Sequence, residues 1–284
     1  MSRINVREFE PLIWNRDWAT DHNKAATERA WYNYMEAHGI SDEQYWDVWY
    51  KMYQRMALEG NPYAMAQLGE LEFLLKNNPQ AGYGWLLRAN NAGAAKAMRL
   101  LGDGYSKYSN DNSSYCHLGF NPKLCFEWTM KAAQMNDLDA IYTAALNFAL
   151  GQDGFPENPN AEKYWLERGT SLGSAKCAIL YADSHCNDPA KKLELYEKAM
   201  AFGDSSAYGR AALHLSRIFS GSENITRNFY NPKMAAKCFI LSWFSDSGLD
   251  ESDLDELHQI PYQFTEQEEK RWAAEAEQLI YRRE

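Results

Sequence analysis

The stretch NPQAGYGWLLRANNAG at residues 78–93 recurs as NPKLCFEWTMKAAQMN at 121–136 and as NPNAEKYWLERGTSLG at 158–173. Each copy opens on Asn-Pro, carries a Trp six residues after the Pro, and closes on Gly or Asn. Asn is a preferred N-cap, and Pro suits the first helical position because its missing N–H would have no partner there. Gly and Asn tolerate the left-handed conformation that often ends a helix. Each stretch therefore predicts one complete helix.

Two further copies keep part of this pattern. The fourth opens at Asp188-Pro189, replaces the Trp by Leu195 and closes at Gly203. The fifth opens at Asn231-Pro232, and its register is two residues longer before Gly248. We expect a helix in both.

Small residues recur at two fixed distances after the closing residues, which we call repeat marks. The marks are Gly60, Gly93, Asn136, Gly173 and Gly203. Four residues after them stand Ala64, Ala97, Ala140, Cys177 and Ala207, and nine residues after them stand Gly69, Gly102, Ala145, Ala182 and Ala212. We expect a second helix there, with small residues where neighbouring helices cross it. The unit is then helix A directly after the mark, a loop, and helix B up to the next mark.

The spacing between marks varies, and we assign the variation to the loop between helices A and B. The long insertions are Ser106 to Phe120, Gln152 to Glu157 and Gly221 to Tyr230. Helix lengths are expected to stay constant.

The combined pattern resembles the Sel1-like repeat family, relatives of tetratricopeptide repeats. Ala-x-x-x-Leu-Gly at Ala64 to Gly69 and the helix B stretches ending at Gly93 and Asn136 carry the resemblance. It covers about residues 60–248 as five repeats and implies an all-α fold, a right-handed α/α solenoid with N- and C-terminal capping helices. We predict one continuous domain: a cap with a degenerate first repeat over 1–59, the repeats over 60–248, and an acidic loop with a capping helix over 249–284.

Both ends of the chain have the pattern of caps. A helix over 23–37 is expected to pair with one that opens at the capping box of residues 41–44, while Trp14 and Trp18 cover the end of the stack. A last helix is expected from Thr265 to about Arg282.

Charge and hydropathy exclude some partners. The chain has 284 residues and a formal charge of -10, with no Lys/Arg-rich stripe, so nucleic acid and anionic membrane are poor partners. No apolar stretch approaches the length of a membrane span, and no apolar leader is visible, so we expect a cytoplasmic protein. The acidic run from Asp246 to Glu256 is expected to be a solvated loop, with steering of a basic partner as the alternative.

We find no spacing typical of a catalytic, cofactor or metal site. None of the six histidines belongs to a zinc motif, and Cys116-His117 and His185-Cys186 place only adjacent residues together. Cys177 and Cys238 are expected to be small buried residues, because they occupy repeat positions suited to Ala. We therefore expect a non-enzymatic protein without cofactor or metal.

The surface left for binding is expected on the concave side lined by helices A. If positions four and nine after each mark face the core, a step of about 100° per residue turns positions three, seven and ten outward. These positions hold Tyr63, Lys96, Asp139, Lys176 and Ser206; Gln67, Leu100, Thr143, Leu180 and Arg210; Glu70, Asp103, Leu146, Asp183 and Leu213. The insertion loop is the other candidate surface, with Tyr105, Tyr108, Tyr115 and Phe120. An ordinary solvated helix face is the alternative interpretation.

The resemblance implies work as an adaptor or scaffold, and in bacteria several Sel1-like proteins are immunity proteins that neutralise a secreted toxin, notably effectors of type VI secretion. We favour an immunity protein that binds and occludes its toxin, with an adaptor or scaffold in signalling or secretion as the alternative. Some cysteine-rich Sel1-like proteins are linked to β-lactam hydrolysis. Because this chain lacks their regularly spaced cysteine pairs, β-lactam hydrolysis is the function that we favour least. The sequence leaves the partner and the oligomeric state open.

Overall fold

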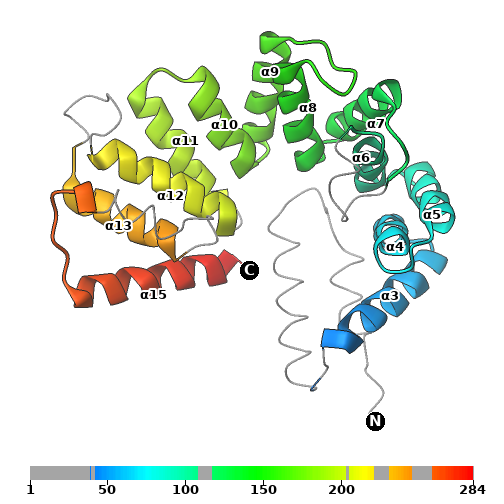
Figure 1. The fold of residues 1–284 in the computed structure, drawn as a ribbon, viewed down its shortest axis with the longest axis horizontal. Helices are drawn as coiled ribbons and strands as arrows, with labels where there is room; N and C mark the ends of the chain where they lie inside the picture. Colours follow the sequence, from blue (N-terminus) through cyan, green and yellow to red (C-terminus); the bar gives the residue numbers. More distant parts are fainter. Residues whose placement is uncertain are drawn as a thin grey trace. The chain divides into compact units, whose positions relative to one another are not determined.

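A computed structural model describes Gly39 and residues 42–107, 117–202, 205–220, 230–244 and 258–283. These residues form twelve helices and no strand (Figure 1). The chain contacts define two units, with the boundary between Arg168 and Gly169.

In the first unit, successive helices from α3 to α8 pack on one another in chain order. Its helices are α3 (Asp42–Leu58), α4 (Pro62–Leu74), α5 (Pro79–Asn91), α6 (Ala95–Gly104), α7 (Pro122–Gln134), α8 (Leu138–Leu150) and α9 (Pro159–Ser171), whose last residues fall in the second unit.

The second unit repeats this order, because each helix again packs on the next. Its helices are α10 (Ala175–His185), α11 (Pro189–Phe202), α12 (Ser205–Ser220), α13 (Pro232–Trp243) and α15 (Glu266–Arg283). The pairs from α4/α5 to α12/α13 are the five predicted A/B units, so the predicted all-α solenoid is confirmed.

The predicted helix starts and ends are confirmed at the level of atoms. The side-chain oxygens of Asn78, Asn121, Asn158, Asp188 and Asn231 each accept a backbone N–H of the first turn, over 3.1 or 3.2 Å. Gly60, Gly93, Asn136 and Gly173 all have φ between 66° and 97°, the left-handed region. The same Asn-Pro start also opens helix A of the first repeat, where Asn61 caps Ala64 over 2.8 Å. A helix directly after Gly60 was predicted, but this capping pair was not.

The small positions of helix A are buried where helices cross. Ala64, Ala97, Ala140 and Cys177 have no exposed surface. A Cβ added to Gly69 would lie 2.9 Å from Leu86, and one added to Gly102 would lie 2.6 Å from Thr129 Oγ1. These close approaches explain why only small residues fit.

A cation covers the helix B tryptophan in three repeats. Arg88 lies 4.7 Å from the ring centroid of Trp85, Lys131 lies 4.3 Å from Trp128, and Arg168 lies 5.3 Å from Trp165. Each cation follows its Trp by three residues, so one helical turn brings them together.

Helix lengths are constant only for helices B, which have 12 to 14 residues. Helices A range from 10 residues in α6 to 16 in α12. The prediction of constant lengths is therefore wrong for helix A. The loop at Tyr105 begins early because α6 ends at Gly104, whereas α12 continues for four turns.

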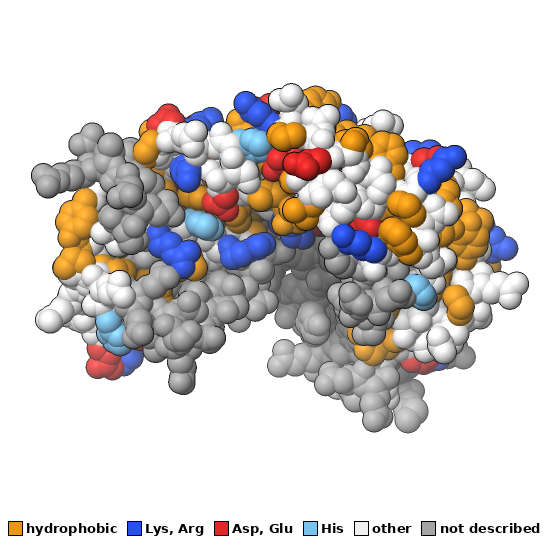
Figure 2. Space-filling view, turned by 45° about the horizontal axis from the view of Figure 1, so that its top comes forward, with side chains coloured by type: hydrophobic (Ala, Val, Ile, Leu, Met, Phe, Trp, Pro, Cys, Tyr) orange, Lys and Arg blue, Asp and Glu red, His pale blue; other side chains and the backbone are white. Residues whose placement is uncertain are grey.

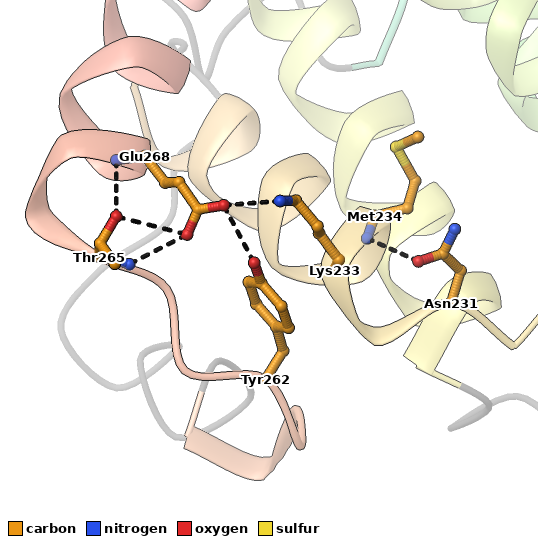
Figure 3. Close-up of polar contacts among 6 residues, drawn as sticks. All are labelled: Asn231, Lys233, Met234, Tyr262, Thr265 and Glu268. Atoms are coloured by element: carbon orange, nitrogen blue, oxygen red, sulfur yellow. Dashed lines mark hydrogen bonds and ion pairs between the residues drawn. The ribbon is translucent and has the colours of Figure 1, made fainter.

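The predicted C-terminal helix is present as α15, and an ion pair connects it to α13 (Figure 3). Glu268 N donates to Thr265 Oγ1 over 3.2 Å, while Thr265 N donates to Glu268 Oε2 over 3.1 Å, which is a capping box. Glu268 Oε1 lies 2.6 Å from Lys233 Nζ and accepts the Tyr262 hydroxyl over 3.0 Å. Lys233 and the cap hold the pKa of Glu268 at about 2.

Several predictions lie outside the described residues. They are the helix over 23–37, Trp14, Trp18, the marks Gly203 and Gly248, and the acidic run Asp246 to Glu256. Within the described part of the chain, no helix is long and apolar enough to cross a membrane.

Candidate protein-binding surface on the helices A

The candidate residues are the outward positions of the helices A, and we call those of each unit the A-helix face of that unit. The residues in the first unit lie on α4, α6 and α8, and those in the second unit lie on α10 and α12.

Lys96 brings four predicted residues of the first unit together. Its Nζ donates to Gln67 Oε1 and lies 2.9 Å from Glu70 Oε2, both on the preceding helix A. The same ammonium lies 5.5 Å from the ring centroid of Tyr63. Residues from two successive repeats therefore form one polar cluster, as their shared register predicts.

Arg99 forms a second polar cluster, which was not predicted from the sequence. Its Nη1 lies 3.1 Å from Asp103 Oδ2, and its Nε lies 3.4 Å from Asp137 Oδ1. Asp137 also caps α8 by accepting the Ala140 N–H over 2.9 Å. The Arg99-x-x-x-Asp103 spacing, which places the two on one helix face, was the available signal. One guanidinium thus joins the second repeat to the third.

Burial raises the pKa of both carboxyl groups in this cluster. It raises the pKa of Asp103 to about 6, although Arg99 acts in the opposite direction. Burial also raises the pKa of Asp137, again against the pull of Arg99. Burial acts to lower the pKa of Arg99, but the carboxylates of Asp103 and Asp137 outweigh it and raise that pKa above its ordinary value. The arginine therefore stays charged, and its loss would leave two half-buried carboxylates without their cation.

The prediction that Leu100, at position seven, turns outward is wrong. It is 1% exposed and belongs to a core cluster with Ala66, Leu86 and Leu101. Helix α6 contacts α4 as well as α5 and α7. The core therefore buries more of this helix than the side at positions four and nine. The other predicted residues of the third repeat, Asp139, Thr143 and Leu146, are half-buried on α8.

In the second unit, Asp183 contacts aromatic residues of two other helices. It accepts the Tyr196 hydroxyl of α11 over 2.5 Å and lies 3.8 Å from His214 Nε2 of α12. The Tyr196 and His214 rings stack nearly parallel, with centroids 4.8 Å apart. Neither Tyr196 nor His214 was predicted. Of the other predicted residues here, Lys176 and Leu180 are half-buried and Arg210 is exposed.

The insertion-loop candidates are divided. Phe120 is 56% exposed, whereas Tyr105 is half-buried and hydrogen-bonded to Tyr83. Burial, and to a smaller extent that hydrogen bond, raises the pKa of Tyr105 to about 12. Tyr108 and Tyr115 lie outside the described residues. The described start of this loop is held by the next one, because Asp153 accepts the Ser106 hydroxyl over 2.8 Å and the Lys107 N–H over 3.0 Å.

The described residues hold no group of three or more His, Cys, Asp or Glu side chains that could bind a metal ion. Cys125, Cys177, Cys186 and Cys238 are unbridged and buried. Burial raises the pKa of Cys125 and of Cys238 to about 12, so both are neutral thiols at physiological pH.

Comparison with solved structures supports the fold. A Sel1 repeat protein from Oxalobacter formigenes superposes with a TM-score of 0.54 at 20% identity, over 90% of this chain and 98% of that one. The chain has the fold of a Sel1-repeat solenoid. A second Sel1-type structure, a protective antigen present in uropathogenic Escherichia coli strains, has a TM-score of 0.47 at 16% identity, over 88% of this chain and 59% of that one. No family model and no curated protein matches the sequence.

Proposed function

We propose that this chain is a protein-protein interaction module and that its A-helix faces, one in each unit, receive the partner. The observation that carries the proposal is the cluster of Tyr63, Gln67, Glu70 and Lys96, in which contacts between two repeats hold polar side chains on one face. Side chains already held by such contacts lose less entropy when a partner binds. The face also differs from repeat to repeat while the small core positions do not, which suits one particular partner.

We further propose that the partner is a secreted toxin and that the chain occludes it, as an immunity protein does. This finer assignment rests on the Sel1-like resemblance and on the acidic charge of -10. An adaptor or scaffold would use the same face, and only the identity of the partner separates the two.

The first experiment tests the face. The tagged full chain is purified from its native host, and the partner is identified by mass spectrometry. Leu180→Arg introduces a large charged side chain at a half-buried position of the face, whereas Leu172→Arg makes the same change in the exposed turn before α10. We expect Leu180→Arg to abolish co-purification and Leu172→Arg to preserve it, with both variants folded by circular dichroism. Equal retention of the partner by the two variants would refute binding at this face.

The second experiment tests immunity. If the co-purified partner is toxic when expressed alone, co-expression of the chain should restore growth, and co-expression of Leu180→Arg should not. A partner without toxicity would refute the immunity role and favour the adaptor.

A further inference from the structure

Two half-buried carboxylates share one cation where α6 approaches the start of α8. Arg99 Nη1 lies 3.1 Å from Asp103 Oδ2, and Arg99 Nε lies 3.4 Å from Asp137 Oδ1. We call these three residues the Arg99 cluster. Asp137 is held in place because it also accepts the Ala140 N–H as the N-cap of α8. Carboxylates that share a site repel each other, and one proton relieves this repulsion while Arg99 still pairs with the other carboxylate.

The side chains of the Arg99 cluster keep only 15% to 18% of their exposure. Figure 2 shows acidic and basic side chains next to each other at several places on the surface, where water and salt screen such pairs. Water screens the half-buried cluster less. Burial raises the pKa of Asp103 to about 6, and Asp137 and Asp139 act in the same direction, whereas the arginine opposes them. The cluster therefore takes up a proton as pH falls from about 7 to about 5.

Charged or titratable groups also face α6 from the other helices that pack on it. On α4, Glu70 lies 2.9 Å from Lys96 of α6. On α7, the Cys125 thiol is neutral at physiological pH, because burial raises its pKa to about 12. Arg88, the one charged residue of α5, stacks on a tryptophan of its own helix. The pH response near neutrality is therefore assigned to the carboxyl groups of the cluster.

We propose that the Arg99 cluster is a pH-sensitive contact between the second and third repeats, which tightens at mildly acidic pH and loosens at neutral pH. The folded chain binds the Asp103 proton more tightly than the unfolded chain does. The stability that this proton contributes is therefore fully present below about pH 4 and is lost as pH rises through about 6. The inference concerns the fold of the first unit and does not depend on which partner the chain binds.

The contact between α13 and α15 provides a reference with the opposite balance of charge. There the single carboxylate Glu268 lies 2.6 Å from Lys233 and accepts hydrogen bonds from Tyr262 and Thr265. Lys233 and these hydrogen bonds hold the pKa of Glu268 at about 2, so its charge does not change between about pH 5 and about pH 7.5. We therefore expect this contact to be insensitive to pH in that range.

Hydrogen-deuterium exchange of the full chain at about pH 5 and about pH 7.5 tests the inference, with rates corrected for the intrinsic effect of pH. We expect the protection of α6 to fall about three- to tenfold from the lower to the higher pH, and that of α15 to stay unchanged. Asp103→Asn, which carries no charge at either pH, should remove the fall in α6. The matched control is Glu268→Gln, which should lower the protection of α15 by the same factor at both pH values.

Three results would overturn the inference: no fall in α6, a fall that Asp103→Asn does not remove, or an equal fall in α6 and α15. The last would mean that pH acts on the whole chain and not on the cluster. The wild-type measurement decides by itself if Asp103→Asn does not fold. Because no partner is present, each of these results leaves the proposed function to its own experiments.

Discussion

The A helices of the first unit and those of the second unit use the same repeat register for different purposes. In the first unit, Lys96 and Arg99 lie among carboxylates and amides of neighbouring repeats, so their contacts join successive helices A. In the second unit, Asp183 contacts Tyr196 and His214, while Arg210 is exposed. A repeat position therefore does not by itself decide whether a side chain contacts a neighbouring repeat or lies exposed.

One residue of register separates the two arginines. Arg99 stands six residues after its mark and Arg210 stands seven after its own. A helix turns by about 100° per residue, so this step changes the direction of the side chain but does not by itself decide its exposure. Position seven of the second repeat holds Leu100 instead, which the core buries.

The largest expected effect comes from removing each arginine in turn. Arg99→Met leaves the half-buried Asp103 and Asp137 without their cation, and we expect a loss of about 2 kcal/mol or more in the free energy of unfolding. Arg210→Met removes an exposed charge and should change it by less than about 0.5 kcal/mol. Urea denaturation of the full chain measures both. Equal losses would show that the comparison between the units is wrong.

A smaller effect is expected from Asp103→Asn, and it depends on pH. The folded state raises the pKa of Asp103 to about 6, so it binds this proton more tightly than the unfolded chain does. Wild type should therefore lose stability relative to Asp103→Asn as pH rises from about 4 to 7, by on the order of 1 to 2 kcal/mol. The change is smaller than a fully buried carboxyl would give, because the side chain keeps 18% of its exposure. A difference that does not vary with pH would contradict the burial of this carboxyl.

The smallest effect is expected from Tyr196→Phe in the second unit. The change removes the hydrogen bond to Asp183 but keeps the ring that stacks on His214. We expect a loss of about 0.5 to 1.5 kcal/mol in unfolding free energy, the usual contribution of one hydrogen bond. A loss as large as that of Arg99→Met would mean that both units are held together by their A-face polar groups.

Most of the fold could be predicted because its signals are local. Asn/Asp-Pro and the repeat marks specify helix ends through caps and left-handed residues that do not depend on distant contacts. Asn61-Pro62 shows that the same signal also starts one helix A, although it was predicted only for helices B. The length of α6 was not predictable in this way, because no comparable signal marks where helix A ends.

The candidate site could be predicted only in part. Lys96, Gln67 and Glu70 were each predicted for the outward positions of helices A, and the structure brings the three side chains into contact. The register could not find Tyr196, which reaches the face from a helix B, or the contact between Arg99 and Asp137, which depends on how closely two repeats approach. Such contacts are properties of packing between repeats and leave no period in the sequence.

The most direct test of the A-helix face is hydroxyl-radical footprinting of the full chain with and without its co-purified partner. Side-chain oxidation is followed at Leu180 and His214 on the face and at exposed Tyr164 and Met135, on helix α9 and at the end of α7. We expect the partner to lower oxidation at Leu180 and His214 and to leave Tyr164 and Met135 unchanged. Protection of Tyr164 and Met135, with Leu180 and His214 oxidised as before, would contradict binding at the A-helix face.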